Sequence, residues 1–138
     1  PPYNTGKDFI YQDNYQIDKE EYDDKIGLFD EDDNRLFKNT ETNGRFHSDW
    51  CSMLYPRLKL EHNLLSDDGV IFISIDDNEV ENLIKICNEI FGEVNYVACV
   101  IWEREYSPVN LKKHFSENHD FALCYAKSIN NLQCNGLC

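Results

Sequence analysis

The segment of residues 48–91 constrains the fold more than any other part of this 138-residue chain. It holds two stretches in which apolar residues recur at helical spacing, separated by the run Val70–Ile75, which is apolar except for Ser74. A short run of this kind is typical of a strand that is buried on both faces of a parallel sheet. Helix, strand and helix in this order therefore predict an α/β fold with a doubly wound, mostly parallel sheet.

Capping residues predict where the two helices begin and end. Ser48 or Asp49 is expected to cap the first helix, and Pro56 inside it predicts a kink or a separate first turn. Asp76, Asp77 and Asn78 offer caps for the second helix, and Gly92 is expected to end it. Residues 76 and 77 also follow a predicted strand, at the edge where α/β sheets bind ligands, so capping and ligand binding are both open for them.

The C-terminal part of the chain has a different pattern. Residues 96–102 (YVACVIW) and 121–126 (FALCYA) are both strand-like, and the polar segment between them shows no helical crossover pattern. We therefore expect an antiparallel strand pair joined by a long loop, and long loops on a rigid sheet often carry binding residues.

These patterns divide the chain into three parts. Residues 1–47 are polar and acidic, with a short strand or helix expected only at residues 7–11. Residues 48–127 form the predicted α/β core, and residues 128–138 form a tail without a pattern.

Composition restricts the class of protein. The formal net charge of -13 argues against a free-standing nucleic-acid-binding module, because phosphate contacts normally require a basic face. No apolar run approaches the roughly 20 residues of a membrane span. Most of the six cysteines fall in apolar helix or strand patterns, where they act as small hydrophobes. We expect a reduced, cytoplasmic protein without membrane contact, and no histidine or cysteine spacing predicts a metal site.

The most informative motif is the first six residues, Pro1-Pro2-Tyr3-Asn4-Thr5-Gly6. It resembles the DPPYNTG segment of amino-group DNA methyltransferases, whose leading Asp has no counterpart in this chain. Further matching segments follow in the order of that family: residues 46–50, 53–58, 64–65, 69–79, 90–92, 102–103, 106–108, 115–120 and 125–127. Together they resemble the modification (Mod) subunit of type III restriction–modification systems, an adenine-N6 methyltransferase of the β class.

The resemblance implies a reaction and its residues. Such enzymes flip an adenine out of double-stranded DNA and transfer a methyl group to its N6 from S-adenosylmethionine. The implied catalytic residues are Pro1, whose carbonyl accepts a hydrogen bond from the amino group, Pro2, which fixes the turn, and Tyr3, which stacks on the flipped base. Asn4 is implied as a cofactor contact. Two further implied contacts with the DNA or the target base are Tyr106 and Asn110.

The resemblance also implies what this stretch lacks. It has no FxGxG loop for the cofactor and no basic DNA-recognition region, so we expect a partial Rossmann-like methyltransferase sheet that is inactive alone. The implied partners of the intact enzyme are a second Mod subunit and a restriction (Res) subunit. Trp50 and its helix are expected either to support the catalytic loop or to serve core packing alone.

Two other interpretations remain open. The same motif type serves cytosine-N4 and orphan DNA methyltransferases, because adenine N6 and cytosine N4 are both exocyclic amines. The chain could also be a non-catalytic interaction module that presents Pro-Pro-Tyr as a peptide ligand and the acidic loop as a partner surface. The long series of matching segments from Trp50 to Lys127 argues against the interaction module, since a linker motif would not bring that series with it.

Overall fold

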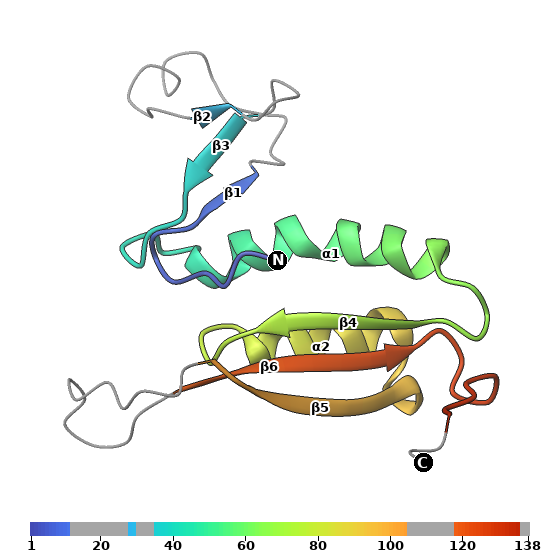
Figure 1. Ribbon diagram of the computed structural model, residues 1–138. Coiled ribbons are helices and arrows are strands. Elements are labelled where there is room, and N and C mark those ends of the chain that lie inside the picture. The colour runs from blue at the N-terminus through green and yellow to red at the C-terminus, as the bar shows by residue number, and fades with distance from the viewer. Residues whose placement is uncertain (12–27, 30–34, 105–117, 136–138) are drawn as a thin grey trace.

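Two helices and two small antiparallel sheets make up the part of the chain that the structure describes, residues 1–11, 28–29, 35–104 and 118–135 of a computed structural model (Figure 1). The larger sheet has the strand order β4-β6-β5, with β4 at Val70–Ile75, β6 at His119–Ala126 and β5 at Tyr96–Glu103. The helices are α1, Phe46–Leu64, and α2, Val80–Phe91. The chain is thus mixed α/β, as predicted.

The direction of the strands differs from the prediction. Both pairings of the larger sheet are antiparallel, so the expected doubly wound, mostly parallel arrangement is not found among the described strands. The strands β4 and β5, joined through α2, do run parallel to one another, but β6 lies between them. The reason is that β5 returns into β6 without a crossover helix in the described residues, and such a return gives an antiparallel pair. The predicted antiparallel C-terminal pair is confirmed.

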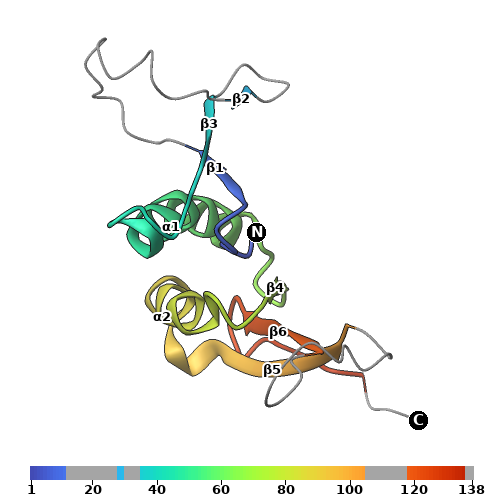
Figure 2. The same ribbon diagram turned by 90° about the vertical axis from the view of Figure 1, so that its left-hand side faces the viewer.

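The strand β4 is buried on one face only, which corrects the prediction of burial on both. Ile73 and Ile75 are buried, whereas Phe72 keeps 64% of its surface exposed and Ser74 is also exposed. The helix α2 lies against one face of the sheet, and α1 packs beside α2 along β4 (Figures 1 and 2). Both helices lie on one side of the sheet. Side chains of β4 therefore alternate between the buried face and the exposed face, as in antiparallel sheets that are covered on one face only.

The predicted helices form, but their N-terminal caps differ from the prediction. The helix α1 begins at Phe46 with Arg45 as its cap, and Asp49 lies in its first turn, where its carboxylate pairs with Arg45 at 3.0 Å. The helix continues through Pro56, which does not mark a separate first turn. At the N-terminus of α2 the cap is Glu79, a residue later than predicted.

The C-terminal end of α2 agrees with the prediction. Gly92 is its C-cap at a φ of +87°, a conformation that side chains with a Cβ rarely adopt. A single turn of 3-10 helix, Glu93–Asn95, then leads into β5.

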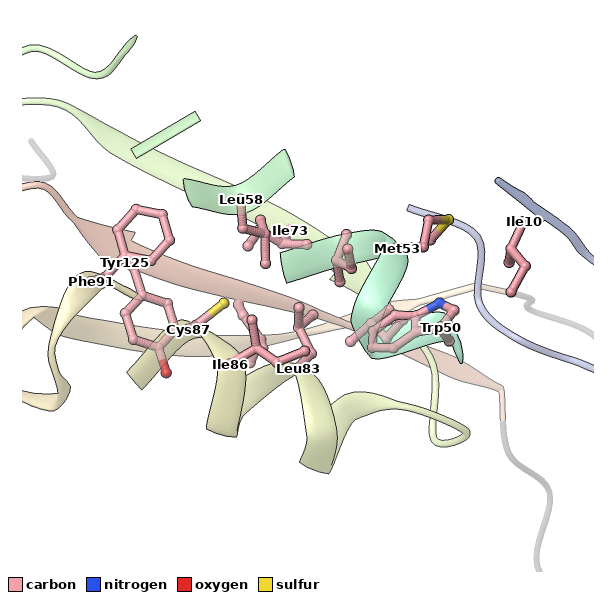
Figure 3. Packing of buried hydrophobic residues seen from close by; sticks show 13 residues of the cluster. Ile10, Trp50, Met53, Leu58, Ile73, Leu83, Ile86, Cys87, Phe91 and Tyr125 are labelled. Atoms are coloured by element: carbon pink, nitrogen blue, oxygen red, sulfur yellow. The ribbon is translucent and has the colours of Figure 1, made fainter. Parts of the chain in front are cut away.

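The core lies between the two helices and the sheet. Trp50, Leu58 and Leu83 are among its least exposed residues, and Tyr125 closes one end (Figure 3). The Tyr125 hydroxyl donates to Oδ1 of Asn88 at 2.7 Å. The described cysteines are all free thiols: Cys51, Cys87, Cys99, Cys124 and Cys134. None of the described helices combines the length and hydrophobicity that a bilayer crossing requires.

The N-terminal segment forms a second sheet that the sequence only hinted at. Its order is β1-β3-β2, with β1 at Phe9–Tyr11, β3 at Arg35–Lys38 and β2 at Leu28–Phe29, and both pairings are antiparallel. This sheet lies across α1 from the larger sheet (Figures 1 and 2). Only β1 falls within the short element predicted at residues 7–11.

Candidate functional site

The loop of residues 1–6 lies against α1 and the start of α2. Its course depends on Asn4, which adopts a φ of +60° and is 1% exposed. Asparagine tolerates this left-handed conformation better than most residues. The loop then turns again at Gly6, while the backbone N–H and hydroxyl of Thr5 donate to the carboxylate of Asp8 at 2.5 and 2.7 Å. The Pro-Pro-Tyr-Asn segment is therefore a shaped loop within the fold.

Trp50 fixes the middle of this loop from α1. Its side chain is fully buried, and its indole Nε1–H donates to the backbone carbonyl of Pro2 at 2.8 Å. The prediction that Trp50 supports the loop is confirmed. The carbonyl of Pro1 precedes that of Pro2, and none of the described residues donates a hydrogen bond to it.

Tyr3 follows this fixed carbonyl and is half-buried, with part of its side chain packed on the hydrophobic core. Pro1 is exposed and Pro2 is half-buried. The structure thus places the three predicted catalytic residues together on one loop. Tyr106 and Asn110 lie in residues 105–117, outside the described residues.

Asn4 joins the loop to a network of buried amides. Its Nδ2 donates to Oε1 of Glu79 at 2.5 Å, and its Oδ1 accepts a hydrogen bond from Nδ2 of Asn39 at 2.8 Å. The same Nδ2 of Asn39 donates at 2.7 Å to the carbonyl of Phe46, at the start of α1. Asn39 is itself fully buried, and Asn43 donates to its Oδ1 at 3.0 Å.

Glu79 is the centre of this network. Its side chain is fully buried, and its carboxylate lies within hydrogen-bond distance of three side-chain nitrogens. These are Nδ2 of Asn4 at 2.5 Å, Nδ1 of His47 at 2.6 Å and Nδ2 of Asn82 at 2.8 Å. The buried charge also affects a neighbour: burial, and then the charge of Glu79, raise the pKa of the Cys51 thiol.

A groove of about 560 Å³ lies between the loop, α1 and β4. It is lined by Pro1 and Pro2, by α1 residues that include Arg57 and Glu61, and by residues 71–74 of β4. Arg57 also donates to the carbonyl of Met53, one turn earlier in α1. The edge of β4 that faces away from β6 pairs with no other described strand.

Sequence reasoning missed the residues that hold the loop. In the sequence, Glu79 is only the last residue of the matching segment 69–79, and no local pattern marks Asn39, Asn43 or His47 as anchors. The only available signal was the acidic residue directly before α2, a position that favours an acid on any helix. Its burial depends on contacts between residues up to 75 positions apart, which no local pattern reveals.

Comparison with known proteins identifies relatives across nearly the whole chain. Residues 1–136 match the N6/N4 family described as DNA methylase. The chain is 40% identical over 134 residues to the type III restriction-modification enzyme EcoPI Mod subunit of Escherichia phage P1. It is 43% identical over 130 residues to the StyLTI Mod subunit of Salmonella typhimurium, and 35% identical over 128 residues to the type II methyltransferase M.KpnI of Klebsiella pneumoniae. Each match covers 93% of this chain but only 20% of either Mod subunit and 26% of M.KpnI, so the chain spans about a fifth to a quarter of these relatives.

Proposed function

This chain belongs to the N6/N4 family of DNA methylases, and from that membership we propose that it forms the target-base part of an enzyme that methylates adenine N6 in DNA. The proposed methyl donor is S-adenosylmethionine. The observation that carries the proposal is the anchored loop: Trp50 holds the carbonyl of Pro2, and Glu79 holds the side chain of Asn4.

The chemical problem explains why an anchored loop is useful. The lone pair of an exocyclic amine is delocalised into the purine ring, so the nitrogen is a weak nucleophile. Such enzymes flip the base out of the duplex into a pocket. Fixed hydrogen-bond acceptors beside the amino group then favour a more tetrahedral nitrogen, and fixed geometry aligns it with the methyl group.

We assign roles to the loop residues on this basis. The carbonyl of Pro1 is the proposed acceptor for the adenine amino group, and within the described part of the chain no other group donates to it. Pro2 restricts the turn, and its own carbonyl is occupied by Trp50. The ring of Tyr3 is the proposed stacking face for the base. Tyr106 and Asn110 remain predicted DNA contacts.

The described residues do not by themselves fit the methyl donor. Asn4 is the predicted cofactor contact, and its side-chain groups are bonded to Glu79, Asn39 and, more weakly at 3.4 Å, the carbonyl of Phe46. We therefore derive no step through the donor, and the cofactor contact of Asn4 stays a prediction. The chemistry assigned to this chain is to hold and orient the base.

We also infer that the larger sheet is part of a Rossmann-like methyltransferase sheet. The unit β4–α2–β5 supports this, because its two strands are parallel and joined by a helix, as in α/β crossovers. The proposed partners are double-stranded DNA, a second Mod subunit and a restriction subunit. With a formal charge of -13, this stretch is a poor source of phosphate contacts, which we assign to other segments of the intact enzyme.

A chimera tests the proposal. This chain would replace the matched stretch of the EcoPI Mod subunit, to which it is 40% identical, and transfer of a tritiated methyl group from S-adenosylmethionine to DNA would be measured. We expect methyl transfer by the chimera and by its Tyr3→Phe variant, which keeps the aromatic face. The Tyr3→Ala variant should be at least about fivefold slower, because stacking contributes roughly 1–3 kcal/mol per base.

Other outcomes would favour the competing interpretations. Methylation of cytosine N4 would identify the other branch of the same family, since its acceptor is also an exocyclic amine. A folded chimera without any methyl transfer would contradict the enzyme proposal and favour an interaction module. The match over residues 1–136 speaks against that module, because a Pro-Pro-Tyr ligand needs only a few residues.

A further inference from the structure

We propose that Glu79 is a positioning residue that sets the place of the Pro-Pro-Tyr-Asn loop relative to α1 and α2. Its carboxylate contacts three separate parts of the fold: Asn4 in the loop, His47 in α1 and Asn82 in α2. Its link to methyl transfer rests on the proposed function, whereas its link to the loop rests on geometry alone.

The position of Glu79 in the chain makes it suitable for this role. It is the N-cap residue of α2, four residues after β4 ends at Ile75. The N-terminus of a helix stabilises a negative charge, which reduces the cost of burying the carboxylate. A buried carboxylate also needs hydrogen-bond donors, and the three side-chain nitrogens meet that need.

The two oxygens of Glu79 have different roles. Oε2 accepts a hydrogen bond from Asn82, one turn along α2, and this bond orients the carboxylate on its own helix. Oε1 accepts a hydrogen bond from Nδ2 of Asn4 at 2.5 Å and lies 2.6 Å from Nδ1 of His47. The loop is therefore attached to the sheet-helix junction through a single oxygen atom.

The attachment matters because Asn4 has an unfavourable backbone conformation. A φ of +60° costs a residue with a side chain free energy that its contacts must offset. The amide of Asn4 is the only side chain of residues 1–4 for which the structure gives a hydrogen bond within the described part of the chain. Without Glu79, we expect the loop to lose its place on Trp50, although the two helices keep their apolar contacts.

The first test uses the Trp50 indole as a reporter on the full chain. The only other tryptophan, Trp102, is 67% exposed, so ¹⁵N spectra of the two indole N–H groups distinguish them. Glu79→Met keeps the side-chain volume and removes both acceptors. We expect exchange of the Trp50 N–H with solvent to accelerate by about tenfold or more, because this N–H loses its bond to the Pro2 carbonyl when the loop is displaced.

Glu79→Gln is the matched rescue. Its carbonyl oxygen still accepts from Asn4, and the side-chain amide of Asn82 turns to present its own oxygen to the new NH₂ group. We expect protection of the Trp50 N–H close to that of the unmodified chain. Glu81→Met, two residues further on at an exposed position paired with Lys85, is the control and should change neither indole signal.

The outcomes decide the proposal even if one variant unfolds. Unchanged protection of Trp50 in a folded Glu79→Met chain would overturn it, as would equal losses in Glu79→Met and Glu79→Gln. If Glu79→Met does not fold, Asn4→Gly removes the same bond from the loop side, together with the bonds of Asn4 to Asn39 and Phe46, and relieves the positive φ. Loss of Trp50 protection in that variant supports the proposal, and retention overturns it.

The chimera supplies the kinetic readout. A residue that positions the loop should lower kcat by up to about 10²-fold in Glu79→Met with little change in the KM for DNA, and Glu79→Gln should restore most of kcat. Equal losses of kcat in the two variants would overturn the positioning role. If the chimera transfers no methyl group at all while Glu79→Met still releases Trp50, the proposed function fails and the positioning of the loop stands.

Discussion

At the scale of single residues, the candidate site depends on polar side chains that are buried. Asn4, Asn39 and Glu79 are the buried polar or charged residues in the described part of the chain, and hydrogen bonds through Asn4 connect all three. No buried side-chain nitrogen or oxygen among the described residues lacks a partner. A fully satisfied network of this kind specifies one arrangement, because any displacement leaves a polar group unpaired. The loop is held mainly by this network and by Trp50.

Trp50→Phe tests the other anchor of the loop. The substitution removes the donor to the Pro2 carbonyl and leaves a small void at a fully buried position. We expect the free energy of unfolding, measured with urea, to fall by about 2 kcal/mol. Trp102→Phe is the control at a position 67% exposed, and it should stay within about 0.5 kcal/mol. Equal effects of the two substitutions would mean that the contact with Pro2 contributes nothing.

We expect the Cys87 thiol to make the free energy of unfolding depend on pH in the alkaline range. Burial, and then the charge of Glu61, raise its pKa from 9.0 to about 12. A raised pKa favours the neutral thiol in the folded state, so its contribution is constant below about pH 9 and is lost as the pH rises toward 12.

Urea unfolding between pH 8 and pH 11 measures this dependence. The unmodified chain should lose stability above about pH 9, and Cys87→Ala should show a shallower decline from a lower starting value. Cys134→Ala, at an exposed position, serves as the control. A decline as steep in Cys87→Ala as in the unmodified chain would show that other groups cause the alkaline loss.

At the scale of helices and strands, local sequence patterns predicted which helices form better than they predicted the residues at which those helices begin. The apolar spacing located both helices, and Gly92 marked the end of α2 because no other residue type takes its φ of +87° easily. The caps escaped prediction for a physical reason. Arg45 and Glu79 cap their helices without a side-chain cap bond, so neither carries the usual capping signature.

Gly92→Ala tests the end of α2. A residue with a Cβ at a φ of +87° is strained, and we expect a loss of about 1–2 kcal/mol in the free energy of unfolding. Gly44→Ala is the matched control, because an added Cβ there meets no atom within 4 Å and the backbone is not left-handed. A Gly92→Ala chain as stable as the control would contradict the assigned C-cap geometry.

Strand direction was beyond the reach of local pattern. The run Val70–Ile75 reads as buried on both faces, yet Phe72 and Ser74 are exposed and β6 pairs with it in antiparallel register, Ile73 opposite Leu123. The partner of a strand is set by contacts about 50 residues away, whereas periodicity reports only on neighbours. The pair β5–β6 was predicted correctly because the segment between its strands lacks a helical pattern.

At the scale of the whole molecule, the site could be predicted only in part from the sequence. The motif located Pro1, Pro2 and Tyr3 on one loop, and Trp50 was expected to support it. The network through Glu79 joins segments that are 75 residues apart in the chain, so it required the structure. The charge of -13 argues against a free-standing DNA-binding module, and it agrees with a stretch that holds a base while other segments contact phosphates.

The most direct test of the account is the identity of the methylated base. DNA modified by the chimera with the EcoPI Mod subunit would be digested to nucleosides and analysed by mass spectrometry. We predict N6-methyladenine, with a loss of at least about fivefold in Tyr3→Ala and little loss in Tyr3→Phe. Methyl groups on cytosine N4, or undiminished N6-methyladenine from the Tyr3→Ala chimera, would contradict it.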